Sequence, residues 1–256
     1  MSAPKIFTSE YYAHMRALEA DSWWNAAMRD IAAELLDWAG LPPRGTLLDV
    51  GAGSGQSIAW FLQAHPGWRA VGLDVAPQGL LAARAAGVGC MSRASALSLP
   101  HAARTVDLVL TLDVLQHLPL DGGDVAALRE MHRVLKPAGL LLLRTNAQAL
   151  PRTTDDRGHN FHKYQPLELE AKLRMAGFTV RRLSRLNALL GLAEIPREWR
   201  ARHASGDRYH GILGNAAPGY WWPAALKRAW LRLEGRAVQA GWRLPFGRTI
   251  VALCQA

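Results

Sequence analysis

The sequence predicts an α/β protein whose doubly wound, mostly parallel sheet has seven strands. Two observations carry this prediction. Short apolar runs alternate with helical stretches from residue 46 to residue 145, which is the rhythm of successive βαβ units. The run from Val106 to Leu112 is almost wholly apolar, as expected of a strand that helices cover on both faces of the sheet.

The individual elements follow from hydrophobic spacing and from turn residues. The first helix is expected over residues 11–40, because Ile31, Leu35 and Leu36 recur at helical spacing and two prolines follow Gly40. Further helices are expected over residues 57–65, 77–86, 124–135, 166–176 and 224–239. Strands are expected over residues 46–50, 70–74, 89–93, 106–112, 140–145, 178–183 and 248–254.

The composition is that of an ordinary globular protein, with 50% hydrophobic and 20% charged residues in a chain of 256. No stretch approaches the roughly 20 apolar residues of a membrane-spanning helix. Residues 1–10 lack the pattern of a signal peptide. Cys90 and Cys254 lie far apart, so a disulfide framework is not implied and a reducing cytoplasm is the expected location.

The net charge of +9 is unevenly distributed along the chain. Residues 144–256 carry 19 basic and 8 acidic side chains, whereas residues 1–143 carry 11 and 13. An anionic partner and a solvated, arginine-rich surface both explain this excess. Nucleic acid is not favoured, because the basic residues are not interleaved with a known RNA-binding motif.

A glycine-rich turn follows the expected strand 46–50 and precedes a helix. Gly51, Gly53 and Gly55 permit a tight turn and close approach of the backbone to a ligand. Asp74 ends the next strand, where a carboxylate can accept hydrogen bonds from ribose hydroxyls. The pair predicts a nucleoside-binding site. The third glycine comes one residue too early for the dinucleotide fingerprint, and Gln56 stands where the sixth position would be.

These features resemble motif I of the class I S-adenosylmethionine-dependent methyltransferases. The resemblance covers residues 45–145 and includes further segments. Val71–Asp74 is similar to the family's ribose-binding strand, and Ala94–Pro100 is similar to its adenine-side loop. Asp107–Leu118 is similar to the fourth strand and the helix after it. Arg133–Gly139 is similar to the turn before the fifth strand.

The resemblance implies a Rossmann-like methyltransferase fold, S-adenosylmethionine as cofactor and a role for each matching position. Gly51 and Gly53 would pack against the methionine part of the cofactor, and Asp49 would hold the loop and reach the cofactor amine through water. Asp74 would bind the ribose and Val75 would lie against adenine. The remaining assignments are Ser95 and Ala96 flanking the adenine ring and Asp113 bordering the methionine end. Many relatives have an acid where Ser95 stands, so adenine recognition would rest on the Ala96 backbone.

The outer segments resemble a narrower group of bacterial methyltransferases associated with glycan or secondary-metabolite pathways. The matching residues are Trp23, Trp24 and Arg29 near the start, the segment Gly158–Tyr164, and Arg243–Gly247 before the last strand. Trp24 and Arg29 are therefore expected at the cofactor site, Arg29 pairing either with the cofactor carboxylate or with an acid such as Glu34. Trp23 and Trp24 either wall the pocket or simply pack against the sheet.

The resemblance also divides the single domain, residues 1–256, into parts. A helical lid is expected over residues 1–40, with Tyr11, Tyr12 and His14 on it, and a cofactor-binding core over 41–150. The acceptor-side loop and last strands would be residues 151–193 and 246–256. A helical insertion over 194–245, which holds five of the ten tryptophans, is either a cap over the acceptor, a membrane-surface helix or a helical pair packed on the core.

Methyl transfer needs alignment, a dry pocket and removal of a proton from the acceptor. The candidates for this work are His117, His159, His162 and Tyr164, each with a structural alternative of capping, loop hydrogen bonding or packing. Asp155, Asp156, His159 and His162 form no standard metal-binding pattern, so no metal is expected.

The function predicted is methyl transfer to an oxygen or nitrogen of a small molecule such as a secondary metabolite, a peptide-derived product or a sugar, and the basic C-terminal half leaves an anionic acceptor as one option. A non-catalytic relative that binds a partner and, less favoured, an NAD-dependent oxidoreductase are the alternatives. A peripheral membrane contact is not favoured, and the sequence does not determine the acceptor or the oligomeric state.

Overall fold

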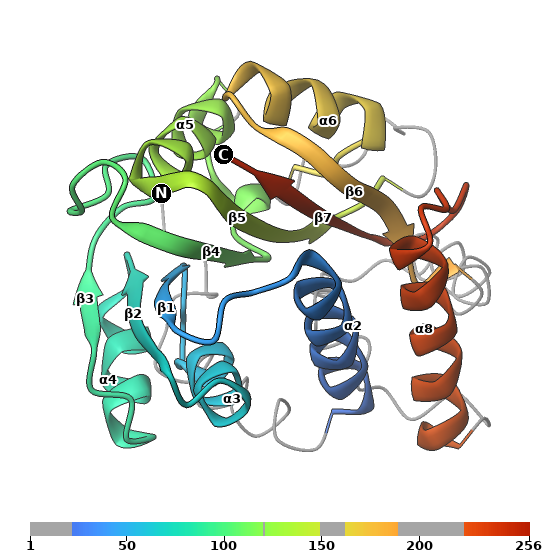
Figure 1. The fold of residues 1–256 in the computed structure, drawn as a ribbon, viewed down its shortest axis with the longest axis horizontal. Helices are drawn as coiled ribbons and strands as arrows, with labels where there is room; N and C mark the ends of the chain where they lie inside the picture. Colours follow the sequence, from blue (N-terminus) through green and yellow to red (C-terminus); the bar gives the residue numbers. More distant parts are fainter. Residues whose placement is uncertain (1–21, 120, 149–161, 189–222) are drawn as a thin grey trace, which may run out of the picture.

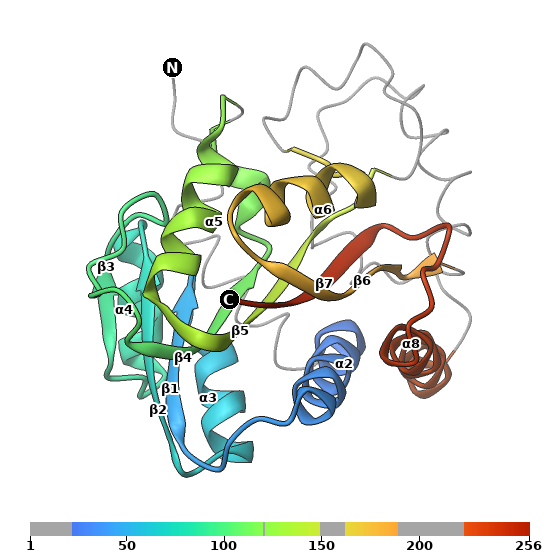
Figure 2. The ribbon, with the colours of Figure 1, turned by 45° about the horizontal axis from the view of Figure 1, so that its top comes forward.

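The computed structural model describes residues 22–119, 121–148, 162–188 and 223–256. A seven-stranded sheet lies between two layers of helices (Figure 1; Figure 2). Its strand order is β3-β2-β1-β4-β5-β7-β6, and all neighbours are parallel except β7, which is antiparallel to both β5 and β6. The predicted doubly wound, mostly parallel sheet with seven strands is therefore confirmed.

Each predicted strand is present, with boundaries that shift by a few residues. The strands are β1 (Gly45–Val50), β2 (Trp68–Asp74), β3 (Met91–Arg93), β4 (Val106–Leu112), β5 (Leu135–Asn146), β6 (Thr179–Leu186) and β7 (Thr249–Gln255). The helices are α2 (Trp23–Ala39), α3 (Gln56–Ala64), α4 (Pro77–Ala85), η2 (Leu115–His117), α5 (Gly123–Val134), α6 (Pro166–Met175) and α8 (Ala224–Gln239). No helix within these described ranges is both long and apolar enough to cross a membrane.

Neighbouring residues of the apolar strands pack into two separate cores. On β4, Leu108 and Leu110 belong to the core formed with α2, α3 and α8, while Val109 belongs to the core formed with α5 and α6. Leu142 and Leu143 of β5 divide in the same way. Because side chains alternate along a strand, a continuous apolar run requires cover on both faces, and the helices supply it.

Strand β5 begins at Leu135, earlier than the turn residues suggested. The segment Lys136–Gly139, expected to be a turn, lies within the strand, with Ala138 at a φ of +65°. The β4–β5 register shifts between Val106 and Leu108, which absorbs this irregular start. After this start, β5 pairs regularly with β7, from Leu140 opposite Gln255 to Asn146 opposite Thr249.

Helix α8 packs along the outer side of α2, as both views show (Figure 1; Figure 2). Arg228 donates through Nε and Nη2 to the two carboxylate oxygens of Asp30, at 2.7 and 2.9 Å. Gly235 lies so close to Ile31 that a β-carbon would come within 2.6 Å of Ile31 Cγ1. The described part of the predicted insertion therefore packs against α2 from outside, and residues 194–222 lie outside the described residues.

The Gly235–Ile31 contact predicts that Gly235→Ala lowers the free energy of unfolding by about 1 kcal/mol. Overpacking costs about 1–3 kcal/mol, and the better helix propensity of alanine returns up to about 1 kcal/mol. Chemical denaturation measures the difference. Gly89→Ala is the control, because no atom lies within 4 Å of its β-carbon position. Equal stability of Gly235→Ala and the unmodified protein contradicts the close packing of α8 on α2.

Candidate functional site

The turn after β1 uses three glycines with left-handed backbone angles. The φ angles of Gly51, Gly53 and Gly55 are +78°, +51° and +76°. At Gly51 a β-carbon would lie 2.2 Å from Val114 Cγ2, so only glycine fits. Gly55 precedes α3 as its N-cap, and a β-carbon there would press on Val88 and Ala83. The sequence prediction of a tight turn into a helix is confirmed.

The end of β2 holds this turn in place. The N–H groups of Gly51 and Ala52 donate to the carbonyl oxygen of Leu73 at 2.8 and 2.9 Å. The carboxylate of Asp74 accepts from Gly53 N–H and from Ala76 N–H, each at 2.8 Å. Asp74 therefore anchors the turn, and each carboxylate oxygen can accept more than one hydrogen bond.

A cavity of about 380 Å³ lies over the carboxyl ends of the parallel strands. This is the edge at which doubly wound sheets bind ligands, and the volume falls in the range of small-molecule sites. Most residues singled out from the sequence line it. They are Trp24, Arg29, Asp49, Gly51, Gly53, Asp74, Val75, Ser95, Ala96, Asp113 and His117. Gly55, His162 and Tyr164 do not line it, and His159 lies outside the described residues.

The nucleoside end of the cavity exposes two apolar side chains. Val75 is 55% exposed and Leu97 is 39% exposed, and both line the cavity. Ser95 Oγ accepts a hydrogen bond from Leu97 N–H at 3.2 Å, so its hydroxyl shapes the adenine-side loop. Exposed apolar groups beside a buried carboxylate fit an aromatic base attached to a ribose.

Asp49 is buried at the base of the glycine turn. Its carboxylate accepts a hydrogen bond from the Ser57 hydroxyl. Burial raises the pKa of Asp49 to about 7, and the nearby Asp74 carboxylate acts in the same direction. The hydrogen bond from Ser57 and the charge of Arg144 oppose the rise only in part. A cationic group placed beside Asp49 would favour its ionised form.

Asp113 and Arg144 form an ion pair in the cavity wall. Arg144 donates from Nε and Nη2 to Oδ2 of Asp113, at 3.0 and 2.6 Å. The guanidinium lies over the ring of Trp24, 4.6 Å from its centroid. Asp113 has a φ of +62°, which is uncommon for a residue with a side chain. Arg144 was not predicted as a site residue, although this arginine interrupts the apolar run of β5 at the end of the strand that reaches the cavity.

Arg29 joins the lid helix to the glycine turn. Its Nη2 donates to Oε1 of Gln56, the first residue of α3, at 3.0 Å. Glu34, the other partner considered for Arg29, pairs instead with α8. Its Oε1 lies 3.6 Å from Nη2 of Arg232 and 3.9 Å from Nε of Arg236. Gln56 had been noticed only as a departure from the dinucleotide fingerprint.

His117 lies in the cavity wall after β4. Its Nε2 is 3.4 Å from Nε2 of Gln116, whose Oε1 accepts from Asn146 N–H. The Gln116 amide nitrogen therefore faces the imidazole, and Nε2 of His117 is the acceptor in this weak contact. Burial lowers the pKa of His117, with a smaller opposing effect of Asp113. The imidazole is thus neutral near pH 7.

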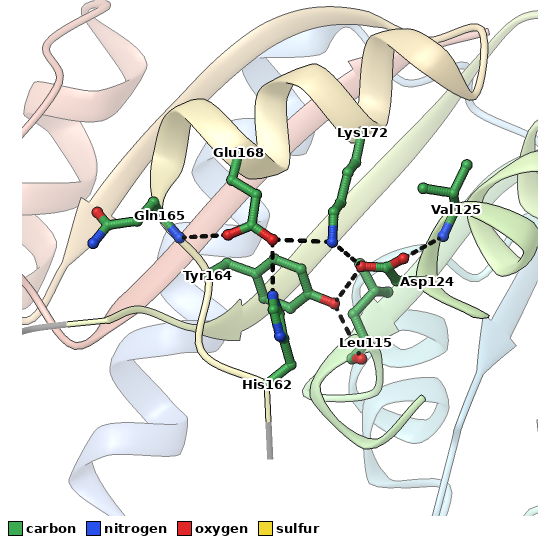
Figure 3. Close-up of polar contacts among 8 residues, drawn as sticks. All are labelled: Leu115, Asp124, Val125, His162, Tyr164, Gln165, Glu168 and Lys172. Carbon is green, nitrogen blue, oxygen red and sulfur yellow. Dashed lines mark hydrogen bonds and ion pairs between the residues drawn. The ribbon is translucent and has the colours of Figure 1, made fainter. Parts of the chain in front are cut away.

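Tyr164 is buried and does not line the cavity, which favours packing over acceptor contact among the two alternatives left by the sequence. The side chain is 1% exposed, and its hydroxyl donates to Oδ2 of Asp124 at 3.0 Å and to Leu115 O at 3.3 Å (Figure 3). Lys172 donates to the same Asp124 oxygen. Burial and the adjacent Asp124 carboxylate raise the pKa of Tyr164 above its usual value.

His162 belongs to the same polar network. Its Nε2 lies 2.9 Å from Oε1 of Glu168, which also pairs with Lys172 at 3.0 Å (Figure 3). The main-chain N–H of His162 donates to Gln116 O at 3.0 Å, which attaches the chain at His162 to the residue next to His117. Within the described part of the chain, no group of three metal-ligating residues occurs, and Asp155 and Asp156 lie outside it.

Most of the basic residues that the structure describes in the C-terminal half do not line the cavity. Of the described lysines and arginines, only Arg29 and Arg144 line it. Several of the others pair with acids or stack on rings elsewhere: Arg228 with Asp30, Arg243 and Arg174 with Glu170, and Arg182 with the Trp38 ring. Much of the charge excess therefore serves the packing of helices and strands.

The fold places a cavity over the carboxyl ends of a doubly wound sheet, and comparison with known proteins indicates the class of protein. Residues 48–143 match the family model described as a methyltransferase domain. An uncharacterized methyltransferase of Mycobacterium leprae is 40% identical over 134 residues, which are 50% of this chain and 45% of the relative. The chain thus spans about half the length of the curated relatives it matches.

Solved structures share the fold at low sequence identity. Phosphoethanolamine N-methyltransferase 2 of Haemonchus contortus, solved with S-adenosyl-L-methionine, superposes with a TM-score of 0.64 at 14% identity, over 98% of this chain and 58% of that one. An S-adenosylmethionine-dependent methyltransferase of Mesorhizobium loti gives 0.56 at 16% identity, over 93% and 99%. Residues 48–143 thus match a methyltransferase domain in sequence, and the chain shares the fold of S-adenosylmethionine-dependent methyltransferases.

The raised pKa of Asp49 predicts that S-adenosylmethionine binds more tightly as the pH rises from about 6 to about 8. The cofactor carries a net positive charge, so it favours ionised Asp49, and binding below the pKa must release a proton. Calorimetry in buffers across this range measures both effects. Asp49→Asn should remove the dependence.

5′-Methylthioadenosine is the matched ligand for this prediction, because it lacks both the sulfonium charge and the ammonium group and should show a smaller pH dependence. Identical profiles for the two ligands contradict the role of Asp49. Without ligand the sign is opposite: because ionising the buried group opposes folding, this residue's contribution to stability decreases as the pH rises from about 4 to about 7.

Proposed function

We propose that the protein is an S-adenosylmethionine-dependent methyltransferase that methylates an oxygen or nitrogen atom of a small molecule. The observation that carries the proposal is the cavity in which the glycine turn and the Asp74 carboxylate meet. Bound S-adenosylmethionine supplies an electrophilic methyl group on its sulfonium sulfur. The protein then has to hold the donor, align the acceptor, exclude water and remove a proton.

The residues present fit this cofactor along its length. The backbone of Gly51 and Gly53 allows a ligand to approach closely, and Asp74 can accept from ribose hydroxyls. Val75 and Leu97 offer the apolar surface that an adenine ring covers. At the other end, the acids Asp49 and Asp113 line the cavity where the cationic sulfonium and ammonium need compensation.

A small acceptor is supported by the way helix α2 walls the cavity. Trp24, Met28, Ile31 and Ala32 of this helix line it, and Trp24 is 4% exposed. Large apolar walls keep water from the reacting atoms and leave room for a compact molecule. These contacts support the lid interpretation of α2, although its buried face is also part of the core.

His117 is the group best placed to accept the proton of the acceptor. It lines the cavity, and its lowered pKa keeps the imidazole neutral at pH 7, so Nε2 can take up a proton when the weak 3.4 Å contact with the Gln116 amide is broken. Of the other candidates among the described residues, His162 is paired with Glu168 and does not line the cavity.

Asp74→Ala is expected to weaken binding of S-adenosylmethionine by about tenfold to hundredfold, because hydrogen bonds to a charged group contribute about 1.5–3 kcal/mol. The variant also loses the anchor of the glycine turn, so its melting temperature should fall. Asp107→Ala is the matched control. Asp107 also accepts a main-chain N–H, from Thr46 at 2.8 Å, but does not line the cavity.

Calorimetry and thermal melting separate the two effects. Asp107→Ala should lose stability and keep its cofactor affinity. If folded Asp74→Ala binds the cofactor as well as the unmodified protein does, the ribose assignment is wrong. If the unmodified, folded protein binds no S-adenosylmethionine, the proposed function is wrong.

His117→Ala is expected to lower turnover by about a hundredfold while binding of S-adenosylhomocysteine stays unchanged, because general-base catalysis contributes about 10²–10⁴-fold. In the unmodified protein, turnover should fall only below about pH 6.5, since the pKa of His117 is lowered. Release of S-adenosylhomocysteine from a panel of aromatic alcohols and amines gives the measurement. Retained turnover in His117→Ala, together with its loss in His162→Ala, contradicts the assignment.

A further inference from the structure

Arg144 is a cation on the mostly apolar face of the sheet that packs against α2 and α3. On β5 it lies on the same face as Leu140 and Leu142, which belong to the core packed against α2 and α3. Its partner in register on β7 is Val251, another member of that core. The Arg144 side chain is only 14% exposed. Burying a cation costs several kcal/mol, so its contacts must compensate.

Two contacts hold the guanidinium in place, and neither of them uses its Nη1 nitrogen. Asp113 Oδ2 accepts from Nε and Nη2, and the ring of Trp24 lies against the guanidinium. In the described part of the chain, Nη1 makes no hydrogen bond, and the side chain lines the cavity. Arg144 is thus held rigidly with a donor group to spare, by a residue in an uncommon backbone conformation.

The surroundings of Arg144 differ from those of the nucleoside end. Val75 and Leu97 lie beyond β2 and β3 at one edge of the sheet, whereas β5, β7 and β6 form the other half. On that half the cavity is lined by Leu142, Val251 and Leu186. A single guanidinium therefore stands among hydrocarbon side chains at the far end of the cavity.

We propose that Arg144 binds a carboxylate inside the cavity through Nη1, and that its apolar neighbours receive the hydrocarbon part of the same molecule. The proposal rests on the proposed function, because both substrates of methyl transfer would enter this cavity. A carboxylate is favoured over a phosphate, because Asp113 and Asp49 in the same wall would repel a dianion.

Two molecules can bring such a carboxylate. One is an acceptor with a carboxylate on an apolar body, and the other is the cofactor, whose amino-acid end carries one. A guanidinium serves both in the same way, through short charge-assisted hydrogen bonds. Ligands with and without the carboxylate separate the two sources.

The experiment measures binding to Arg144→Met by calorimetry with two pairs of probes. The first pair is S-adenosylhomocysteine and 5′-methylthioadenosine, which lacks the amino-acid end. The second pair is hexanoate and hexanamide, added to protein saturated with 5′-methylthioadenosine. We expect Arg144→Met to bind the carboxylate member of one pair about tenfold to hundredfold more weakly, with the neutral member unchanged.

Loss of hexanoate binding identifies the acceptor as the carboxylate source, and loss of S-adenosylhomocysteine affinity identifies the cofactor. If neither carboxylate probe discriminates between Arg144→Met and the unmodified protein, the proposal is wrong. Arg182→Met is the matched control, because Arg182 also stacks on a tryptophan, 3.9 Å from the Trp38 ring centroid, but does not line the cavity.

A second variant removes a confounding charge, since Arg144→Met leaves Asp113 unpaired and able to repel an anion. In Asp113→Asn/Arg144→Met both charges are absent, and we expect the weaker carboxylate binding to persist. Recovery in the double variant means that repulsion by Asp113 caused the loss and overturns the proposal. Failure of the unmodified protein to bind either nucleoside probe would instead count against the proposed function, and hexanoate alone would still test Arg144.

Discussion

The backbone between β1 and α3 turns through three positive φ angles within five residues, and the cavity depends on this turn. The main chain at Gly51 lies so close to Val114 that a side chain at this position would not fit. The backbone itself therefore forms this part of the cavity wall. The hydrogen bonds that hold the turn come from the next strand, through Leu73 and Asp74. Holding the turn and offering a carboxylate to a ribose are thus two tasks of one side chain. That coupling is why stability and ligand affinity have to be measured separately at Asp74.

Electrostatics inside the cavity contrasts with electrostatics on the surface. Within it, Asp49 is poorly solvated and close to another acid, which raises its pKa to about 7. The buried pair of Asp113 and Arg144 is held by two hydrogen bonds to one oxygen. Such charges are costly without a ligand and are understandable where a ligand carries both a cation and an anion. On the surface, the arginines of α8 mainly attach one helix to another, so a strongly basic half need not indicate an anionic partner.

How far the sequence predicted the molecule depended on the range of the interactions involved. The sheet, the glycine turn and Asp74 were predicted, because strand alternation and turn geometry are written in consecutive residues. The ion pair between Arg228 and Asp30 joins residues 198 positions apart, and the sequence around either residue does not indicate its partner. For the same reason the described part of the insertion was expected as a cap or a packed helical pair, and only the structure shows that α8 supports α2. Tyr164 also needed the fold, because its partner Asp124 lies on a different helix.

By itself, the sequence determined the class of fold, and it predicted the glycine turn and many of the residues that line the cavity beside that turn. It did so because glycine, proline and apolar spacing act locally on the backbone. The tertiary structure decided which polar groups share an environment. It placed His117 in the cavity wall and His162 behind it, and it brought Arg144 against Trp24 and Asp113. These arrangements arise where strands and helices distant in the chain pack together, since burial and hydrogen-bond partners exist only once the sheet and its helices are assembled.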